Sequence, residues 1–506
     1  MTNVTNSKLL ARNTALNLAG QGIPLVAALI AIPWLIRGLG TERFGILTLA
    51  WATIGYFGLV DLGLGRALTH AVATRLGSDR EDELVTVGWT ALTLMFLLGA
   101  VGAAALAGVT PWLVNDLLKI PSALSAESER SFYLLALSLP IVVSTAGLRG
   151  IIEAHQHFGL ATMLRMPLAI FSYAGPLVAL PFTNRLDVVV AVLVLGRVVT
   201  WLAHFIFCIK RYTFLRHGFA IRQRVIWPLL RLGGWMTVSN VVSPLMTYFD
   251  RFLIGALLPM AAVAYYVTPF EAVMKLLLFP SALMGVLFPA FAESFARDRM
   301  RTAQLFDKGV RAVVLVIFPV SLILVTLASE ILHLWVGAEF ARAGSVVLQW
   351  LAAGALINSV GFVGFAVLQG VGRPDLTGKL NLIELPLYIL MIWVLAKTMG
   401  LAGVAMAWTL RVLVDTAVLW VIARRSLAVD RRLLRTPALT WLTMGLALLV
   451  GALLPGTTAR IAYLFAVATI YLPIAWLGLV TPSERQAVRR LARKSMAIDD
   501  PSRQPA

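Results

Sequence analysis

The sequence predicts an all-α polytopic membrane protein, and three observations support this fold class. Of the 506 residues, 59% are hydrophobic and 13% are charged, and the mean hydropathy is +0.84. Soluble domains carry roughly 25% charged residues. The apolar residues also gather in long runs, and the basic residues alternate between the connections that join those runs. A soluble chain of this length could not hide so much apolar surface from water.

The apolar runs give the expected number of membrane spans. A helix needs about 20 apolar residues to cross a bilayer. Runs of this kind predict about fourteen transmembrane helices, near residues 14–36, 44–66, 84–109, 131–152, 160–182, 188–209, 233–258, 262–291, 309–329, 346–369, 380–396, 401–423, 438–454 and 461–480.

The connections predict how the chain is oriented. Every second connection, beginning at the N-terminus, belongs to a set with 31 basic residues, and the remaining connections hold 8. Cytoplasmic loops carry the excess of Lys and Arg, so both termini are expected in the cytoplasm. The net charge of +18 is then an orientation signal, and no nucleic-acid partner is expected. Two histidines of a predicted cytoplasmic loop, His155 and His157, are expected to be solvated.

A short internal match predicts a duplicated architecture. MLRMPLAI (163–170) and LIELPLYI (382–389) lie in the fifth and eleventh predicted spans. A separation of six spans indicates two related six-helix halves, a common plan among transporters. The expected organisation is an N-terminal lobe at 1–210, a cytoplasmic linker at 211–232, a C-terminal lobe at 233–424, two further helices at 437–481 and a basic cytoplasmic tail at 482–506.

Charged residues inside predicted spans are the main functional signal. A charge in the bilayer centre costs several kcal/mol, and such residues usually mark a substrate or ion path. The cations are candidate substrate-binding residues of a cavity: Arg197, Arg251, Lys275 and Arg411. Three of the acids are candidates for ion coupling: Glu271, Asp415 and Asp250.

Two of the charge pairs stand one helical turn apart. Glu271 with Lys275, and Arg411 with Asp415, have the i, i+4 spacing that places both side chains on one helix face. Each pair either neutralises itself and serves packing, or borders a water-filled cavity. Both interpretations stay open at this point.

The remaining intramembrane charges lack such a neighbour. Asp250 and Arg251 are adjacent, and adjacent residues point about 100° apart on a helix. Each is therefore expected to find a partner on another helix or in a cavity. Arg197 has no acid in its own span, which favours a cavity-facing role. Asp61 and Glu384 are assigned structural or gating roles, although a transport role for Asp61 is equally open.

Prolines indicate where the predicted spans bend. Pro24 and Pro33 fall in the first span, and Pro269, Pro280 and Pro289 fall in the eighth. Each removes a backbone hydrogen bond and kinks a helix. We expect Pro24, Pro269 and Pro280 to take part in gating.

No enzyme signature occurs. The sequence contains neither a phosphate-binding P-loop nor a nucleophile elbow, so we expect neither ATP hydrolysis nor another enzymatic activity. Cys208 is the single cysteine, which excludes a disulfide framework and a cysteine-based metal site. No cofactor is expected.

Several segments, taken in order, resemble one transporter family. They are ARNTALNLAG (11–20), RGLGTERFGILTLA (37–50), DLGLG (61–65), FDRFLIG (249–255) with AYY shortly after it, and LQGVGRPDLTGKLNLIELPLYI (368–389). In these segments the chain resembles the Wzx-type oligosaccharide flippases of the polysaccharide transporter family. That family belongs to the multidrug/oligosaccharidyl-lipid/polysaccharide exporter (MOP) superfamily. The resemblance covers nearly the whole chain and specifies no particular substrate.

The resemblance implies a fold and a cargo. It implies two six-helix lobes in a V around a central cavity, with alternating access driven by an ion gradient. The implied cargo is an oligosaccharide on a polyprenyl diphosphate, usually undecaprenyl, in the bacterial inner membrane, for cell-surface polysaccharide biosynthesis. Membrane lipids, a polysaccharide polymerase and glycosyltransferases are the further partners considered. Arginine suits phosphate oxygens because its donors form a planar fork, which gives the four intramembrane cations a purpose.

Two other functions stay open from the sequence. One is a drug or cation antiporter of the MATE type, with the same fold. That branch usually has twelve spans, and cation sites favour acids over a set of four cations. The other is a non-transporting membrane scaffold for polysaccharide synthesis, which would have little reason to keep charges inside its spans.

Overall fold

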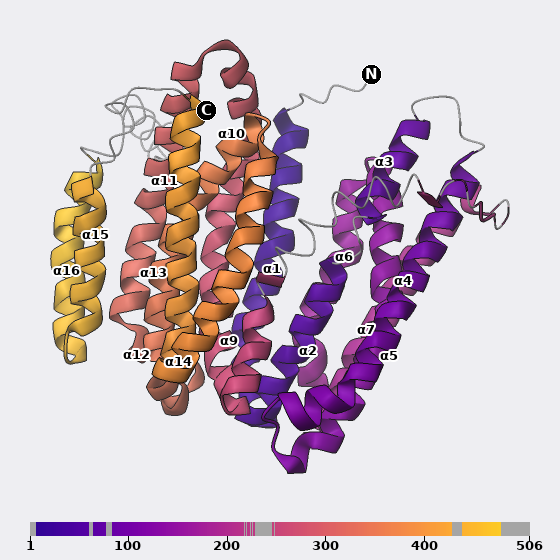
Figure 1. Cartoon of the computed structure of the whole chain (residues 1–506), viewed down its shortest axis with the longest axis horizontal. Coiled ribbons are helices and arrows are strands. Elements are labelled where there is room, and N and C mark those ends of the chain that lie inside the picture. The colour runs from indigo at the N-terminus through magenta and orange to yellow at the C-terminus, as the bar shows by residue number, and fades with distance from the viewer. Residues whose placement is uncertain are drawn as a thin grey trace, which may run out of the picture. The chain divides into compact units, whose positions relative to one another are not determined.

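The chain is all-α throughout its described part (Figure 1). The computed structural model describes residues 7–59, 64–76, 83–216, 218, 220–222, 224, 226–227, 245–246, 248–427 and 438–476. Within these ranges the chain forms helices and turns without a strand. The predicted fold class, an all-α polytopic membrane protein, is confirmed. Asp61 and the predicted tail at 482–506 lie outside the described residues.

The described residues fall into two compact units. The first unit lies within Met1–Lys275, Trp335–Val347 and Gly378–Trp408, and the second within Leu276–Leu334, Leu348–Thr377 and Thr409–Ala506. Two long helices contribute residues to both units, α13 (Ala338–Gly370) and α14 (Pro374–Leu427). The range 1–210 belongs entirely to the first unit, and the subdivision into two six-helix lobes stays a prediction.

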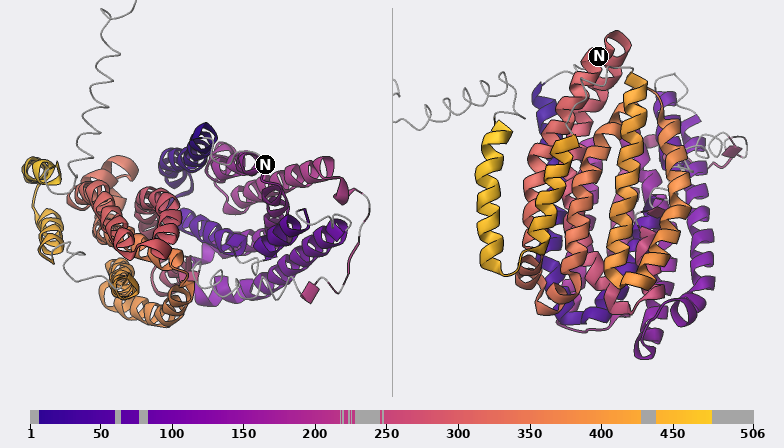
Figure 2. Two further views of the ribbon diagram at one scale, coloured as in Figure 1. Left: turned by 90° about the horizontal axis from the view of Figure 1, so that it is seen from above. Right: turned by 60° about the vertical axis from the view of Figure 1, so that its left-hand side comes forward.

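The first unit is built around closely packed helices. Its helices are α1 (Ser7–Leu39), α2 (Thr41–Leu59), α3 (Leu64–Leu76), α4 (Leu84–Trp112), α5 (Ser122–Ala154), α6 (Phe158–Ala179), α7 (Leu186–Arg211) and α9 (Met260–Met274). In Figures 1 and 2, α4, α5 and α7 lie side by side. Gly99 of α4 lets the backbones approach, because a Cβ there would lie 2.5 Å from Cα of Pro140 in α5. Small residues commonly serve this purpose between membrane helices.

The second unit has its own apolar core. It contains α10 (Leu278–Arg297), α11 (Arg299–Thr326), α12 (Ala328–Val336), α15 (Ala438–Leu453) and α16 (Thr457–Ile474), with parts of α13 and α14. Buried side chains of α10, α11, α13, α14 and α15 form one cluster, which includes Phe291, Phe306, Val363 and Ala423. Figure 2 shows α15 and α16 as neighbouring helices, and both also contact α11.

The predicted spans overlap helices where the structure describes them, and residues 233–244 of the seventh run lie outside the described residues. Each of the fourteen candidate runs overlaps helical residues in the described ranges. Nine helices of that part are long and apolar enough to cross a membrane, and Trp441–Leu453 is a shorter apolar helix. The eleventh and twelfth runs share α14, which is interrupted at Gly400, where φ is +61°. Glycine suits this position because other residues rarely adopt a positive φ. The total of fourteen stays a prediction.

The eighth predicted span is broken, as its prolines indicate. α9 ends at Met274, a 3₁₀ turn occupies Lys275–Leu277, and α10 begins at Leu278. The carbonyl four residues before Pro280 lies in this turn. Pro280 has no N–H to donate to it, so the α-helical hydrogen bond is missing there. Pro269 lies inside α9, and Pro24 lies inside α1, without ending either helix.

The histidines of the α5–α6 turn differ from the expectation of solvated side chains. The His155 ring stacks on Tyr212 with centroids 4.0 Å apart, and His157 Nδ1 lies 3.0 Å from the Tyr212 hydroxyl. Both histidines are half-buried. Burial raises the pKa of Tyr212 to about 12. The prediction was wrong because the segment after α7 folds back onto this turn, which a loop composition does not reveal.

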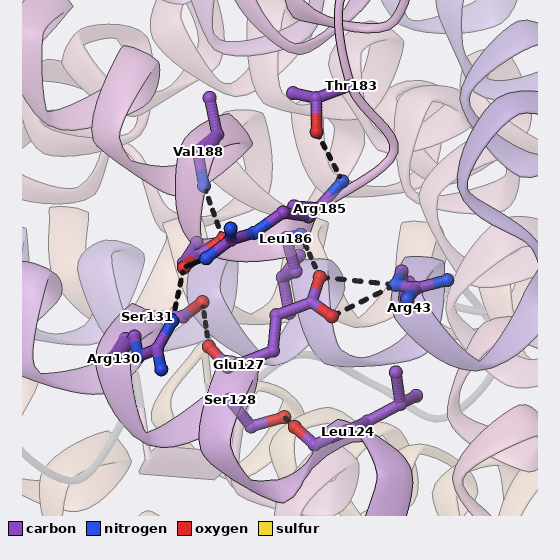
Figure 3. Close-up of polar contacts among 11 residues, drawn as sticks. Arg43, Leu124, Glu127, Ser128, Arg130, Ser131, Thr183, Arg185, Leu186 and Val188 are labelled. Carbon is purple, nitrogen blue, oxygen red and sulfur yellow. Dashed lines mark hydrogen bonds and ion pairs between the residues drawn. The ribbon is translucent and has the colours of Figure 1, made fainter.

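A polar cluster joins three helix N-termini in the first unit (Figure 3). Glu127 of α5 accepts hydrogen bonds from Arg43 Nε of α2, at 3.1 and 3.2 Å, and from the backbone N–H of Leu186. Leu186 is the first residue of α7, whose initial N–H groups have no partner within the helix. Glu127 therefore caps α7 from a neighbouring helix, and its negative charge suits the positive end of the helix dipole.

A second carboxylate completes the cluster. Arg185 makes two hydrogen bonds with Asp187, from Nε at 3.1 Å and from Nη2 at 2.7 Å, and Arg130 Nη1 lies 3.5 Å from the same carboxylate. Asp187 is buried, so its charge needs these partners. Together the two carboxylates fix α2, α5 and α7 at one end of the unit.

We expect Glu127→Gln to lower stability measurably. The amide keeps one acceptor but loses the charge that holds Arg43 and Leu186, and hydrogen bonds to charged groups contribute about 1.5–3 kcal/mol. The midpoint of thermal unfolding of the purified protein should fall clearly. Glu293→Gln is the matched control, because the Arg297–Glu293 pair at 3.5 Å is exposed on both sides and worth little. Equal shifts for the two variants would contradict the capping role.

Candidate functional site

A helical hairpin of the first unit carries the candidate site. Residues 248–257 are helical, Leu258 and Pro259 turn the chain, and α9 follows from Met260. The FDRFLIG and AYY segments thus occupy the two arms of one hairpin. Short connections of this kind place successive helices side by side and antiparallel, so polar residues of one arm meet those of the other.

Asp250 finds its partner on the second arm. Its Oδ2 accepts a hydrogen bond from the Tyr266 hydroxyl at 2.8 Å, and its Oδ1 accepts from the backbone N–H of Arg251 at 2.7 Å. Asp250 and Tyr266 are both fully buried. The expectation that Asp250 and Arg251 seek separate side-chain partners is confirmed.

Arg251 pairs with Glu271 across the hairpin. Arg251 Nη2 lies 2.9 Å from Glu271 Oε1, and the guanidinium carbon lies 5.2 Å from the Tyr248 ring and 5.5 Å from the Phe270 ring. The Arg251 side chain is 2% exposed. A buried charge is tolerated when it is paired and hydrogen-bonded, and aromatic faces attract cations further. The described residues offer no partner for its Nε.

Glu271 is shared between two cations. Its second oxygen, Oε2, lies 3.5 Å from Lys275 Nζ, one turn later. The Lys275 side chain is 30% exposed, against 20% for Glu271. Lys275 also begins the 3₁₀ turn that separates α9 from α10. The Arg251–Glu271–Lys275 chain therefore runs from a buried arginine to an accessible lysine at a helix break.

Aromatic residues surround this chain of charges. Phe270 contacts Trp408 of α14 edge-to-face, with centroids 5.9 Å apart, and a Cβ on Gly55 of α2 would lie 2.9 Å from the Tyr248 ring. The approach of α2 to α9 depends on Gly45, since a Cβ there would lie 2.6 Å from the backbone oxygen of Met260. The hairpin is thus packed against α2 and α14 within the first unit.

The other predicted cations lie elsewhere. Arg197 of α7 belongs to the first unit, is 8% exposed, and donates from Nη1 to the Leu193 carbonyl at 3.3 Å. In the part of the chain that is described, no carboxylate pairs with it. Arg411 and Asp415 lie in the portion of α14 that belongs to the second unit. Arg411 and Arg251 thus belong to different units, and nothing places Arg197 beside Arg251.

The structural candidates can be placed in part. Glu384 lies in the portion of α14 that belongs to the first unit, and it is 6% exposed. Pro24 and Pro269 lie inside helices of the first unit, and Pro280 lies in the first turn of α10 in the second. Gating by these residues stays a prediction.

Sequence reasoning missed the aromatic partners. Tyr248, Tyr266 and Phe270 were not among the candidates, although they contact the charges directly. Tyr266 belongs to AYY, a segment quoted above for family resemblance alone. A signal did exist, because a buried carboxylate such as Asp250 requires a hydrogen-bond donor, and the AYY segment supplies tyrosine hydroxyls on the next helix.

Comparisons with known proteins agree with this architecture. The family model "Polysaccharide biosynthesis protein" matches residues 10–295. A putative O-antigen transporter of Shigella flexneri is 29% identical, over 82% of this chain and 97% of that protein. The lipopolysaccharide biosynthesis protein WzxC of Escherichia coli K12 is 24% identical, over 77% of this chain and 75% of that protein.

Solved structures show the same fold at low identity. An inward-facing multidrug resistance MATE family transporter of the MOP superfamily has a TM-score of 0.69 at 16% identity, covering 83% of this chain and 99% of that one. A MOP superfamily transporter from Pyrococcus furiosus has a TM-score of 0.60 at 16% identity, covering 83% and 95%. At this identity the likeness to these structures shows the fold alone. The family model matches more than half of this chain. The chain therefore belongs to the polysaccharide biosynthesis protein family, as its sequence motifs indicate.

Proposed function

We propose that this protein is a flippase that moves an oligosaccharide, linked to a polyprenyl diphosphate, from the cytoplasmic to the outer leaflet of the bacterial inner membrane. The observation that carries the proposal is the Arg251–Glu271–Lys275 chain, which runs from a buried arginine to an accessible lysine at a helix break, in a member of this family. The named relatives, a putative O-antigen transporter and a lipopolysaccharide biosynthesis protein, support the same function.

The different exposure of the two cations supports an order in which they bind the diphosphate. Lys275 is the accessible cation, so it meets the phosphate oxygens first and releases one oxygen of Glu271. Arg251 then leaves its carboxylate partner and binds the phosphate. The coplanar N–H donors of its guanidinium suit two phosphate oxygens. In the empty protein the carboxylate keeps both cations paired, which avoids an uncompensated buried charge. Arg197 and Arg411 are proposed as further cavity cations.

Glu271 is proposed as the ion-coupling group. A buried carboxyl group holds a proton more tightly, and a nearby cation weakens that hold. When phosphate oxygens take Arg251 and Lys275, Glu271 loses the cations that keep it ionised and takes up a proton. Cargo movement is then linked to proton movement without ATP. Asp415 and Asp250 are the other candidates.

Reconstitution provides the direct test of function. We expect the full-length protein in proteoliposomes to move a fluorescent oligosaccharide on undecaprenyl diphosphate between leaflets, with stimulation by an imposed pH gradient. A drug antiporter would instead exchange organic cations and leave this lipid in place. A scaffold for polymerase or glycosyltransferases would do neither, and either of those outcomes would reject the flippase.

Both termini are proposed to be cytoplasmic, together with the connections at 210–231 and 424–436. A cysteine placed at Thr213 or Leu433 should be shielded from an impermeant maleimide in intact cells, whereas one at Ala123 should react. The native Cys208 is buried, so it should contribute little background. Labelling at Thr213 from outside would overturn the topology.

A further inference from the structure

The second unit contains a groove that the transport mechanism does not use. Its volume is about 800 Å³, and its walls come from α11, α13, α15 and the portion of α14 after Thr409. We call it the lateral groove. All of its lining residues belong to the second unit. It therefore has no residue in common with the charged chain of the first unit.

The lateral groove has apolar walls and a cation at one end. Trp350, Trp420 and Trp441 line it, and Arg424 lies beside Trp420, with the guanidinium carbon 5.8 Å from the ring centroid. No carboxylate pairs with Arg424 in the ranges that the structure describes. The indole Nε1 of Trp420 is buried and lacks a hydrogen-bond partner among the same residues. The Arg424 guanidinium thus carries a charge that no carboxylate of the described residues balances.

The opposite end offers no comparable group. Gln349 lies there, and its amide nitrogen already donates to the carbonyls of Val325 at 3.2 Å and Ala452 at 3.5 Å. The groove is thus asymmetric, with one end ready to receive an anion and the remainder suited to hydrocarbon.

The lateral groove also has exposed apolar side chains in its lining, which would meet lipid hydrocarbon in a membrane. Leu413, Val421, Leu449 and Leu453 line it and are themselves exposed, Leu453 to 73%. From Thr409 to Arg424 an α-helix rises about 22 Å. An elongated apolar chain entering from the bilayer fits this shape better than a compact molecule does.

We propose that the lateral groove binds an anionic phospholipid of the membrane, with an acyl chain along its walls and the phosphate at Arg424. Charge complementarity selects the headgroup, since basic pockets between helices on the cytoplasmic side bind anionic lipids. Arg424 begins a predicted cytoplasmic connection that holds five arginines. Bulk lipid is also present at high local concentration, so mass action fills a groove that faces it.

The bound lipid would join α15 to the rest of the unit. It lies between α14 on one side and α15 on the other, and it replaces empty space with hydrocarbon contacts. A ligand that binds only the folded state stabilises it in proportion to the logarithm of its concentration. Thermal stability should therefore rise with the fraction of anionic lipid.

The test uses the full-length protein, delipidated in detergent, with native mass spectrometry as the readout. The probes are phosphatidylglycerol and phosphatidylethanolamine with identical acyl chains. We expect about five-fold tighter binding of phosphatidylglycerol than of phosphatidylethanolamine. One basic residue near an anionic headgroup contributes a binding free energy of that size. Arg424→Gln should abolish this preference. Arg425→Gln is the matched control, since that residue is adjacent and does not line the groove.

A second variant tests the hydrocarbon part. Gly445 of α15 lines the groove, and a Cβ there meets no heavy atom within 4 Å. Gly445→Phe should fill the groove and weaken binding of both lipids. Gly108→Phe in α4, where a Cβ also meets nothing, is its control.

Three results would overturn the proposal. One is equal binding of the two lipids by the wild type, and another is a preference that survives Arg424→Gln. The third is displacement of phosphatidylglycerol by an equal concentration of polyprenyl diphosphate, which would assign the groove to the cargo. Should Gly445→Phe fail to fold, the Arg424 comparison decides alone.

Discussion

Replacing Arg251 with alanine is expected to abolish glycan export while the protein still reaches the membrane. The variant leaves Glu271 with Lys275 as its remaining cation and removes the fork that receives phosphate oxygens. Truncating one partner of a buried hydrogen-bonded charge pair costs about 2–5 kcal/mol, so transport should fall on the order of a hundred-fold or more. The measurement is surface glycan in cells that depend on this protein.

The comparison with Arg149→Ala separates the site from a general loss of charge. Arg149 also pairs with a glutamate, Glu153, at 3.5 Å, but both side chains are more than a third exposed. Exposed pairs contribute little, and this variant should export normally. Normal export by Arg251→Ala at equal expression would show that the diphosphate does not depend on this residue.

Arg251→Lys should be intermediate. The charge is kept, but the planar fork is lost, and an ammonium group does not reproduce the guanidinium's contacts with the Tyr248 and Phe270 rings. Partial export would point to phosphate recognition, whereas full export would point to charge alone.

Replacing Glu271 with glutamine is expected to uncouple transport from the pH gradient. The amide still accepts a hydrogen bond from Arg251 but cannot gain or lose a proton. Flipping in proteoliposomes should persist at the rate seen without a gradient, and stimulation by the gradient should disappear. The variant should also bind cargo, since both cations remain.

Glu153→Gln is the control for this experiment, because Glu153 pairs with an arginine outside the site. Equal stimulation of the wild type and Glu271→Gln would eliminate Glu271 and leave Asp250 and Asp415 as candidates. Dependence of the wild type on sodium in place of protons would reject the proton scheme entirely.

Much of the candidate site could be predicted because charged residues are easily recognised inside the apolar spans of a membrane protein. Arg251, Glu271 and Lys275 stand out against an apolar background, where a charge is costly. The i, i+4 spacing of Glu271 and Lys275 also fixes a shared helix face. The same pattern could not show that Arg411 lies in the other unit or that Arg197 has no place in the Arg251–Glu271–Lys275 chain, since the spacing of charges within a span does not report contacts between helices.

The aromatic partners and the lateral groove were beyond such reasoning. Tyr248 and Phe270 are ordinary residues in an apolar run, and their role depends on lying over one guanidinium. The groove depends on how α13, α14 and α15 pack, and its open volume corresponds to no motif. Periodicity tells which residues share a face and says nothing about which helix that face meets.

The sequence by itself determined the class, the helical character, the bending of the eighth span and the family. These follow from local physics, because apolar length, missing backbone donors and motif order need no knowledge of neighbours. Only the tertiary structure decided that Arg251 pairs with Glu271, that Asp250 pairs with Tyr266, and that Arg411 belongs to another unit. Those outcomes depend on contacts between helices, where side chains distant in sequence compete for each buried charge.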